Sequence, residues 1–281
     1  MTWRLDVVHR TVFHYKTPVR ASYNEARMTP VTDLHQSTVS SRVSLNPPVP
    51  VRRYWDYWGS QVTVFDIHEP HDQLVVTSAS VVETEPALEP GVQVGWADLT
   101  ESEITDQFDE LLRPTTYTGD SAELAAAAAD IRSTAPHPAA AAEAVGAWVH
   151  DALTYETGVT GVHTSAAEAW AARRGVCQDF AHVALVMLRS IGVPARYVSG
   201  YLHPRREAAI GESVAGESHA WVEAWVGEWW GFDPTNNEPI GHRHVGVGRG
   251  RDYADVAPLH GVLSGGQTQS LEVEVTLTRL R

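Results

Sequence analysis

Cysteine is almost absent from this sequence: Cys177 is the single cysteine in 281 residues. One cysteine cannot form an internal disulfide or a cluster of thiolate ligands, so a disulfide framework and a zinc–thiolate site are both excluded. Two roles remain for Cys177, an inert buried thiol and a nucleophile. A single free thiol also fits a reducing compartment, so we expect a cytoplasmic protein.

Positive charge is also scarce. The chain has 21 lysine and arginine residues against 35 aspartate and glutamate residues, which gives a net charge of −14, and Lys16 is the single lysine. Nucleic acid and anionic membrane surfaces repel so acidic a chain, so we expect neither as a partner.

Long apolar runs are missing as well. No stretch is apolar for long enough to cross a bilayer. The first residues lead directly into an alternating segment, without the charged start and apolar run of a secretory signal. The hydrophobic fraction of 43% is ordinary for a globular protein, and the length allows one large domain or two modest ones.

The segment after Cys177 predicts a core helix that begins at this residue. Apolar residues recur at helical spacing as far as Ile191, and Gly192 and Pro194 then end the helix. The unpaired N–H groups and the dipole of a helix N-terminus favour a thiolate and can also receive a developing oxyanion. This position therefore favours a nucleophile over an inert thiol.

A base and an orienting group for that nucleophile follow downstream. Residues 218–226 alternate and are rich in Trp and Val, which predicts a strand that starts near His219. Residues 229–233 predict a second strand that ends at Asp233. In an antiparallel hairpin, His219 and Asp233 lie near the same open end, where the carboxylate can hold the imidazole in one tautomer. We therefore predict a papain-like catalytic triad of Cys177, His219 and Asp233.

The other histidines suggest a metal site only weakly. The chain has 14 histidines, and His242 and His244 have plausible ligand spacing, as do His68 and His71. No cysteine cluster or His-Glu-x-x-His helix accompanies them. We therefore expect surface or loop histidines at these positions, with no metal and no other cofactor.

Four segments resemble the core of bacterial transglutaminase-like proteins, in matching order. They are Gly-Val-Cys-Gln-Asp-Phe-Ala-His at 175–182, Gly-Val-Pro-Ala-Arg-Tyr-Val-Ser-Gly-Tyr at 192–201, Ser-His-Ala-Trp-Val-Glu at 218–223 and Phe-Asp-Pro-Thr at 232–235. The N-terminal stretch, including 24–30, is similar to the β-rich domain that precedes this core in one bacterial branch. The resemblance implies an α+β fold, with a papain-like transglutaminase core preceded by an antiparallel β-sandwich-like domain.

Pattern and resemblance together predict the organisation of the chain. An N-terminal β domain at 1–84 precedes a Pro-rich acidic connector at 85–118. The catalytic core covers 119–268, and 269–281 forms a C-terminal strand that returns to a sheet. The expected strands and helices are strands at 3–15, 37–45, 51–57, 61–67, 73–82, 194–203, 218–226, 229–233 and 270–277, and helices near 104–112, from 120, at 137–153, from 164 and from 177.

Three aromatic residues are candidates for the substrate cleft. Trp221 follows His219 by two residues and so shares its face of a strand, and Trp170 and Tyr155 are candidates for the rim. The Gly- and Glu-rich loop at 207–217 has the composition of a mobile lid. Two further polar residues of the Cys177 helix, Asp179 and His182, are expected to act locally rather than in catalysis.

The resemblance implies acyl transfer through a thioester on Cys177, with a peptide, a protein or a small amide as substrate. An amine acceptor would make the protein a transglutaminase, and water would make it a cysteine protease or amidase. The family also holds inactive members, so a non-catalytic binding module is the third reading. A transglutaminase that uses lysine would find almost no acceptor on this chain, because Lys16 stands alone. The sequence does not indicate an oligomeric state.

Overall fold

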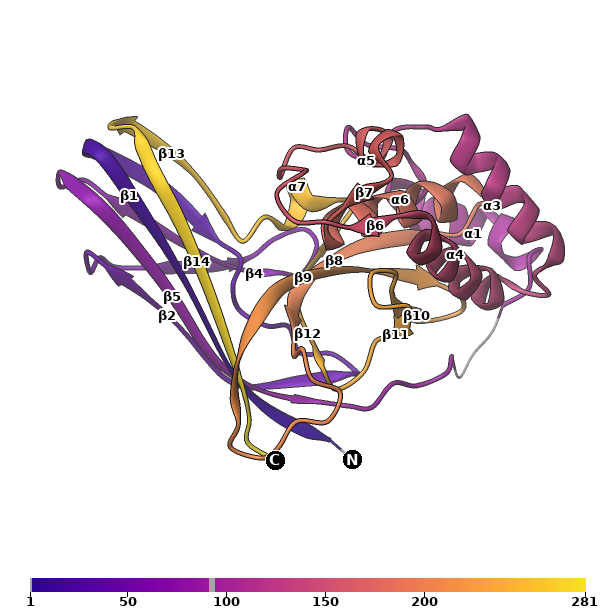
Figure 1. The fold of residues 1–281 in the computed structure, drawn as a ribbon, viewed down its shortest axis with the longest axis horizontal. Coiled ribbons are helices and arrows are strands. Elements are labelled where there is room, and N and C mark those ends of the chain that lie inside the picture. The colour runs from indigo at the N-terminus through magenta and orange to yellow at the C-terminus, as the bar shows by residue number, and fades with distance from the viewer. Residues whose placement is uncertain (1, 91–93) are drawn as a thin grey trace.

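The structure, a computed structural model, describes residues 2–90 and 94–281. Long strands fan out on one side of the molecule and the helices gather on the other, with strands running between the two parts (Figure 1). This mixed architecture, with a large antiparallel sheet and a helical layer, confirms the predicted α+β fold class. Residues 91–93, which fall within the predicted connector, lie outside the described residues.

The β-rich part is built around β1, which pairs antiparallel with four other strands. Its first half lies between β5 and β14, and its second half pairs with β4 and β13. Apolar side chains from β1, β2, β4 and β5 form a buried cluster inside this part. The strands are β1 (Trp3–Ala26), β2 (Gln36–Asn46), β3 (Arg52–Trp55), β4 (Gln61–Ile67), β5 (His71–Thr84), β13 (Leu259–Gly265) and β14 (Thr268–Arg279).

Strand β1 is longer than the sequence predicts, because it does not end at Tyr15. The register between β1 and β5 shifts between His14 and Val19, and Pro18 falls inside this irregularity. A proline fits a bulge of this kind because no ladder hydrogen bond is required from it there. The strand therefore continues to Ala26 and joins both halves of the β-rich part.

The helical part surrounds α6, which is buried along nearly its whole length. Helices α3, α4 and α5 pack on it, as do strands β8 and β9. None of the described helices combines the length and the apolar character needed to span a bilayer. The helices are η1 (Asp98–Thr100), α1 (Ser102–Gln107), α2 (Asp109–Leu112), α3 (Ala122–Thr134), α4 (Pro138–Ala152), α5 (Ala166–Ala172), α6 (Cys177–Ser190) and α7 (Tyr253–Val256).

Strand β9 joins the helical part to the β-rich part. Its residues 213–216 pair with β14, and its residues 217–224 pair with β8. Strand β13, in the range that the sequence assigned to the core, instead pairs with β1. The remaining strands are β6 (Thr154–Tyr155), β7 (Arg174–Gly175), β8 (Ala195–Leu202), β9 (Ser213–Trp225), β10 (Trp229–Asp233), β11 (Glu238–Pro239) and β12 (His244–Gly250).

The segment 207–217, whose composition is that of a mobile lid, is hydrogen-bonded to the C-terminal strand. Its last five residues belong to β9. Earlier in the segment, Arg279 of β14 donates to the carbonyl of Ala208 at 2.7 Å, and the N–H of Gly211 donates to the carbonyl of Arg279 at 2.7 Å. Contacts along its length therefore hold this segment against the C-terminal strand.

Candidate active site

Cys177 is the first residue of α6, as the sequence predicts, and its side chain is partly exposed. The preceding turn is closed by Asp179, whose Oδ2 accepts the N–H of Val176 at 2.8 Å and the hydroxyl of Thr160 at 2.7 Å. Asp179 thus shapes the backbone that presents the thiol. The first N–H groups of a helix have no intrahelical partner and point outward along the helix axis at its N-terminus. In α6 this is the end at which Cys177 lies.

His219 and Asp233 meet at the paired strands β9 and β10, where both side chains are buried. Nε2 of His219 lies 2.7 Å from Oδ2 of Asp233. An ionised carboxylate only accepts hydrogen bonds, so Nε2 carries the proton and donates it. Nδ1 is then the ring nitrogen of His219 that remains for Cys177.

The surroundings of His219 favour its charged form. Burial alone lowers the pKa of His219, but the negative charge and hydrogen bond of Asp233, followed by the interaction with the Cys177 side chain, raise it to about 10. His219 is therefore an imidazolium at neutral pH.

The Asp233 carboxylate is fully buried and accepts five hydrogen bonds. Burial raises the pKa of Asp233, but the His219 charge and the hydrogen bonds from both histidines outweigh burial and hold it well below its usual range. Asp233 is thus ionised. The donors are Nε2 of His219 at 2.7 Å, Nε2 of His244 at 3.2 Å, the N–H of Thr235 at 2.9 Å, the N–H of Asn236 at 3.2 Å and Nδ2 of Asn236 at 2.7 Å.

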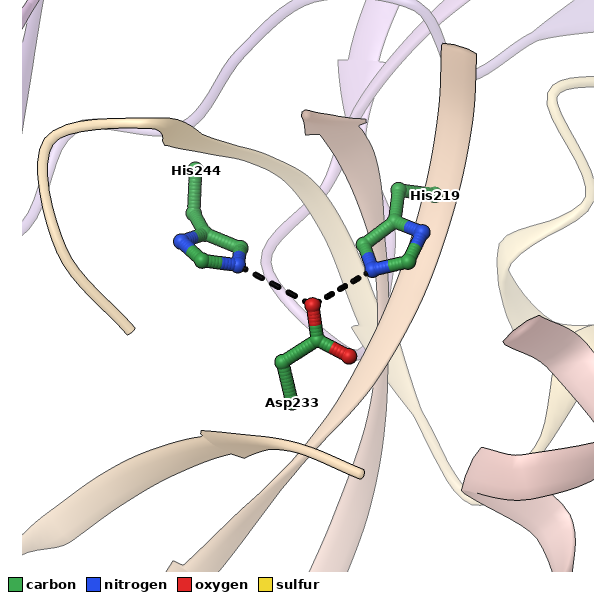
Figure 2. Close-up of side chains that lie close together, drawn as sticks. All are labelled: His219, Asp233 and His244. Atoms are coloured by element: carbon green, nitrogen blue, oxygen red, sulfur yellow. Dashed lines mark hydrogen bonds and ion pairs between the residues drawn. The ribbon is translucent and has the colours of Figure 1, made fainter. Parts of the chain in front are cut away.

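His244 is the member of this site that sequence reasoning missed. It was expected on a loop or at the surface, but it is buried at the start of β12 and points at Asp233 from the side opposite His219 (Figure 2). Its Nδ1 accepts the N–H of Gly241 at 3.3 Å, so the ring proton sits on Nε2 and is donated to Asp233. Burial, the largest influence, lowers the pKa of His244, and the ring is neutral.

The three side chains in Figure 2 also resemble a metal site. One ligand atom from each of His219, Asp233 and His244 lies within 4.8 Å of the others, and two imidazoles with a carboxylate suit zinc. The tautomer of His244 argues against this use. Metal binding at Nε2 would move the proton to Nδ1, where it would oppose the N–H of Gly241. Hydrogen bonding among the described residues accounts for the cluster.

A cavity of about 310 Å³ opens beside His219. Tyr155, one of the predicted cleft residues, lines it with 46% of its surface exposed. Burial raises the pKa of Tyr155 to about 12, and the negative charges of Cys177 and Glu217 act in the same direction. Tyr155 pairs with Gly175, two residues before Cys177, in the short parallel ladder of β6 and β7. The lining residues are Tyr155, Leu202, Pro204, Glu217, His219, Thr235, Asn236 and Arg243.

The other two aromatic residues lie elsewhere. Trp170 is buried in the helical core, where its Nε1 donates to Oε2 of Glu123 at 2.8 Å, and it does not line this cavity. Trp221 lies behind the site with its ring edge-on to His244, and it lines a separate cavity of about 40 Å³. A Cβ on Gly200 would lie 2.5 Å from the Trp221 ring, so a glycine is needed beside it.

Comparison with known protein families matches most of the chain. Residues 125–234 match the model described as the transglutaminase-like superfamily, and residues 5–83 match the bacterial transglutaminase-like N-terminal region. The uncharacterized protein ML0607 of Mycobacterium leprae is 49% identical over 279 residues, which cover 99% of both chains. A stretch of 69 residues is 38% identical to a protein-glutamine gamma-glutamyltransferase of Pseudomonas aeruginosa and covers 22% of this chain and 10% of that one.

Among solved structures, a candidate cysteine protease from Cytophaga hutchinsonii is similar over 100% of this chain and 92% of its own. The TM-score is 0.76 and the sequence identity is 20%. At this identity the similarity concerns the fold. It extends through the β-rich part as well as the helical part.

Proposed function

Because this chain belongs to the transglutaminase-like superfamily, we propose that it is a thiol enzyme that transfers or cleaves an amide acyl group. The observation that carries the proposal is the buried pair of His219 and Asp233, which uses Nε2 of the imidazole and leaves Nδ1 for Cys177 at the start of α6. A nucleophile, a base and an orienting carboxylate in this order are the parts that covalent acyl transfer needs.

The reaction then runs in two halves. The Cys177 thiolate attacks the amide carbonyl carbon, and N–H groups at the start of α6 stabilise the oxyanion. The His219 imidazolium gives its proton to the departing amine, which leaves a thioester on Cys177. In the second half, neutral His219 takes a proton from the acceptor as the acceptor attacks the thioester carbon, and the thiolate leaves.

The substrate in this proposal is an amide of a peptide, a protein or a small molecule. Glutamine side chains are one such amide, and the acceptor is a primary amine or water. The chemistry of both halves is the same for either acceptor, so the residues of the triad do not select between them. As part of the same proposal, we place the enzyme in the cytoplasm, which cell fractionation with an antibody would test.

Hydrolysis is the second candidate, and the walls of the cavity favour it. Glu217 and Tyr155 are exposed there, and Thr235, Asn236 and Arg243 supply further polar groups. Water therefore has a polar route to the thioester beside His219. A peptidase or amidase would use the same triad with this water as the acceptor.

The test combines substrate turnover with labelling of the single cysteine. The wild type and Cys177→Ala are offered a glutamine-containing peptide, with and without an added primary amine, and the products are followed by mass. Amine incorporation that depends on Cys177 supports a transferase, and release of ammonia or of a peptide fragment supports a hydrolase. An absence of product, with Cys177 resistant to iodoacetamide at neutral pH, would overturn the proposal in favour of a binding module.

A further inference from the structure

Asp233 lies between two histidines, and only His219 has a part in the proposed reaction. Nε2 of His219 and Nε2 of His244 meet the same oxygen, Oδ2, at 2.7 Å and 3.2 Å (Figure 2). His219 belongs to β9 and His244 to β12. The neutral His244 can only donate to this oxygen, because the N–H of Gly241 occupies its other ring nitrogen.

The remaining three donors to Asp233 belong to its own turn, although one of them, Nδ2 of Asn236, also lies 3.4 Å from Nε2 of His219. They come from Thr235 and Asn236, which follow Asp233 directly in the chain and move with its turn. Among the described residues, His219 and His244 are the two hydrogen-bond donors that reach Asp233 from other strands. His219 must also change its charge during the reaction. His244 is therefore the contact that holds the carboxylate to the surrounding sheet while His219 gains and loses a proton.

The strand that carries His244 is in turn held by the β-rich part. Gly246 of β12 pairs with Gly200 of β8, next to a register shift between Gly246 and Gly248. Gln36 of β2 meets it: its Oε1 accepts the N–H of Gly246 at 2.7 Å, and its Nε2 donates to the carbonyl of Gly246 at 2.8 Å. Nε2 also donates to the carbonyl of Val31 at 2.6 Å, and Gln36 is buried.

We propose that His244 is a positioning residue for Asp233, and that the N-terminal β region takes part in the active site through Gln36. The inference rests on the proposed function, since it concerns the same triad. It also gives the N-terminal region a task in catalysis. Fully satisfied buried hydrogen-bond networks are the ones that fix a single geometry.

The test compares two buried histidines with different neighbours. His244→Phe keeps an aromatic ring but removes the donor to Asp233. His9→Phe is the matched control, because His9 is equally buried but bonds Tyr201 and Thr11 instead. His244→Gln can restore an N–H near the position of Nε2. For each variant we would measure thermal stability, kcat, KM and the rate of Cys177 alkylation by iodoacetamide against pH.

We expect His244→Phe to lower kcat by roughly tenfold to a hundredfold, the range found when outer hydrogen-bond partners of metal-bound histidines are removed, with KM little changed. His244→Gln should recover most of the loss. The acid limb of the alkylation profile should move to higher pH, because a poorly held Asp233 stabilises the His219 imidazolium less and the thiolate forms later. His9→Phe should lower stability but leave kcat and the alkylation profile as in the wild type.

Normal kcat and an unmoved alkylation profile in His244→Phe would overturn the inference, as would an equal loss of kcat in His9→Phe. Gln36→Leu should also lower kcat. An unchanged kcat in this variant would show that the N-terminal region does not contribute to the active site. Failure of the proposed function looks different: the wild type itself would then give no turnover that depends on Cys177. The alkylation profile needs no substrate, so it tests His244 in that case also.

Discussion

Gly175, two residues before Cys177, lies directly against the carboxylate of Asp179, two residues after Cys177. A Cβ at Gly175 would come within 2.4 Å of Oδ2 and 2.7 Å of the Asp179 Cβ. That carboxylate also accepts the N–H of Val176, which closes the turn before the nucleophile. The glycine and the aspartate therefore act together to set the backbone that presents Cys177.

Gly175→Ala should disturb this turn. The added methyl group cannot be accommodated by a side chain that is already hydrogen-bonded, so we expect a loss of roughly 1–3 kcal/mol in unfolding free energy, together with slower alkylation of Cys177. Gly161→Ala is the control, because a Cβ there meets nothing within 4 Å. Chemical denaturation and the alkylation rate measure both effects. Equal stability of the two variants would contradict the role of the Gly175 contact.

Asp233→Asn should shift the pH dependence of activity. In the wild type, the charge and hydrogen bond of Asp233 outweigh burial and raise the pKa of His219 from 6.5 to about 10. Loss of that charge lowers the pKa again, so the alkaline limb of kcat/KM should move from near pH 10 toward neutral pH, with a large fall in kcat. A pH–rate profile measures the shift, and an alkaline limb that stays in place would show that another group sets it.

The same substitution has a consequence for stability with a defined sign. Because the folded pKa of His219 is raised, its contribution to stability is complete below about pH 6.5 and is lost as the pH rises through about 10. The stability difference between the wild type and Asp233→Asn should therefore be larger at pH 6 than at pH 10. Denaturant titrations at the two pH values check this, and a difference that grows with pH would have the wrong sign.

Substitutions of Tyr155 and of Trp170 should have different effects on substrate binding. Tyr155 is exposed in the cavity beside His219, whereas Trp170 is buried in the helical core. Tyr155→Ala should raise KM by about tenfold, since one aromatic contact is worth on the order of 1 kcal/mol or more. Trp170→Phe should lower the melting temperature, because Nε1 loses its bond to Glu123, and should leave KM unchanged. A raised KM in Trp170→Phe together with an unchanged KM in Tyr155→Ala would instead place Trp170 in the cleft.

The sequence reveals the elements of the triad because each has a strong local pattern. The helix from Cys177 and the strands around His219 and Asp233 appear within a few residues of their predicted positions. Helical periodicity marks the first, and alternation with Trp and Val marks the others. The hydrogen bond between His219 and Asp233 follows once the two strands pair.

Strand β12 and its His244 escape prediction for a physical reason. Glycine occupies alternate positions 246, 248 and 250, and glycine is depleted in strands. Here the glycines allow close packing: a Cβ at Gly250 would lie 2.4 Å from the Cβ of Asp255, and one at Gly248 would lie 3.1 Å from the hydroxyl of Ser60. Ser60 comes from a distant part of the chain, so no local pattern reveals that contact.

The strand face that Trp221 shares with His219 predicts a place in the cleft, but at Trp221 this face turns inward. The β-rich part covers it, and Trp221 packs beside His244 and does not line the cavity next to His219. The segment 207–217 is a second case. The composition of 207–217 suggests mobility, but Arg279 reaches it from the far end of the chain. Both features depend on contacts between segments that the sequence does not show to be neighbours.

Glu223 offers the last prediction, because this buried carboxylate joins two partly buried arginines behind the active site. It accepts hydrogen bonds from Nε of Arg196 at 2.7 Å and from Nε of Arg249 at 3.0 Å. Burial raises the pKa of Glu223, but the charges of Arg249 and Arg196 outweigh burial and lower it to about 2. A depressed folded pKa means that this pair of contacts stabilises the protein above about pH 4.5 and less as the pH falls toward 2.

Glu223→Gln should therefore cost roughly 3–5 kcal/mol at neutral pH, because it removes the buried carboxylate that Arg196 and Arg249 share, and only Arg249 keeps another, that of Asp33. Glu274→Gln, on an exposed position of β14, should change stability by about 0.5 kcal/mol or less. Between pH 4.5 and pH 2, the difference in unfolding free energy between the wild type and Glu223→Gln should become smaller, since the wild-type carboxyl group becomes neutral as well. A difference in unfolding free energy that stays constant from pH 7 to pH 3 would mean that Glu223 acts through packing rather than through its charge.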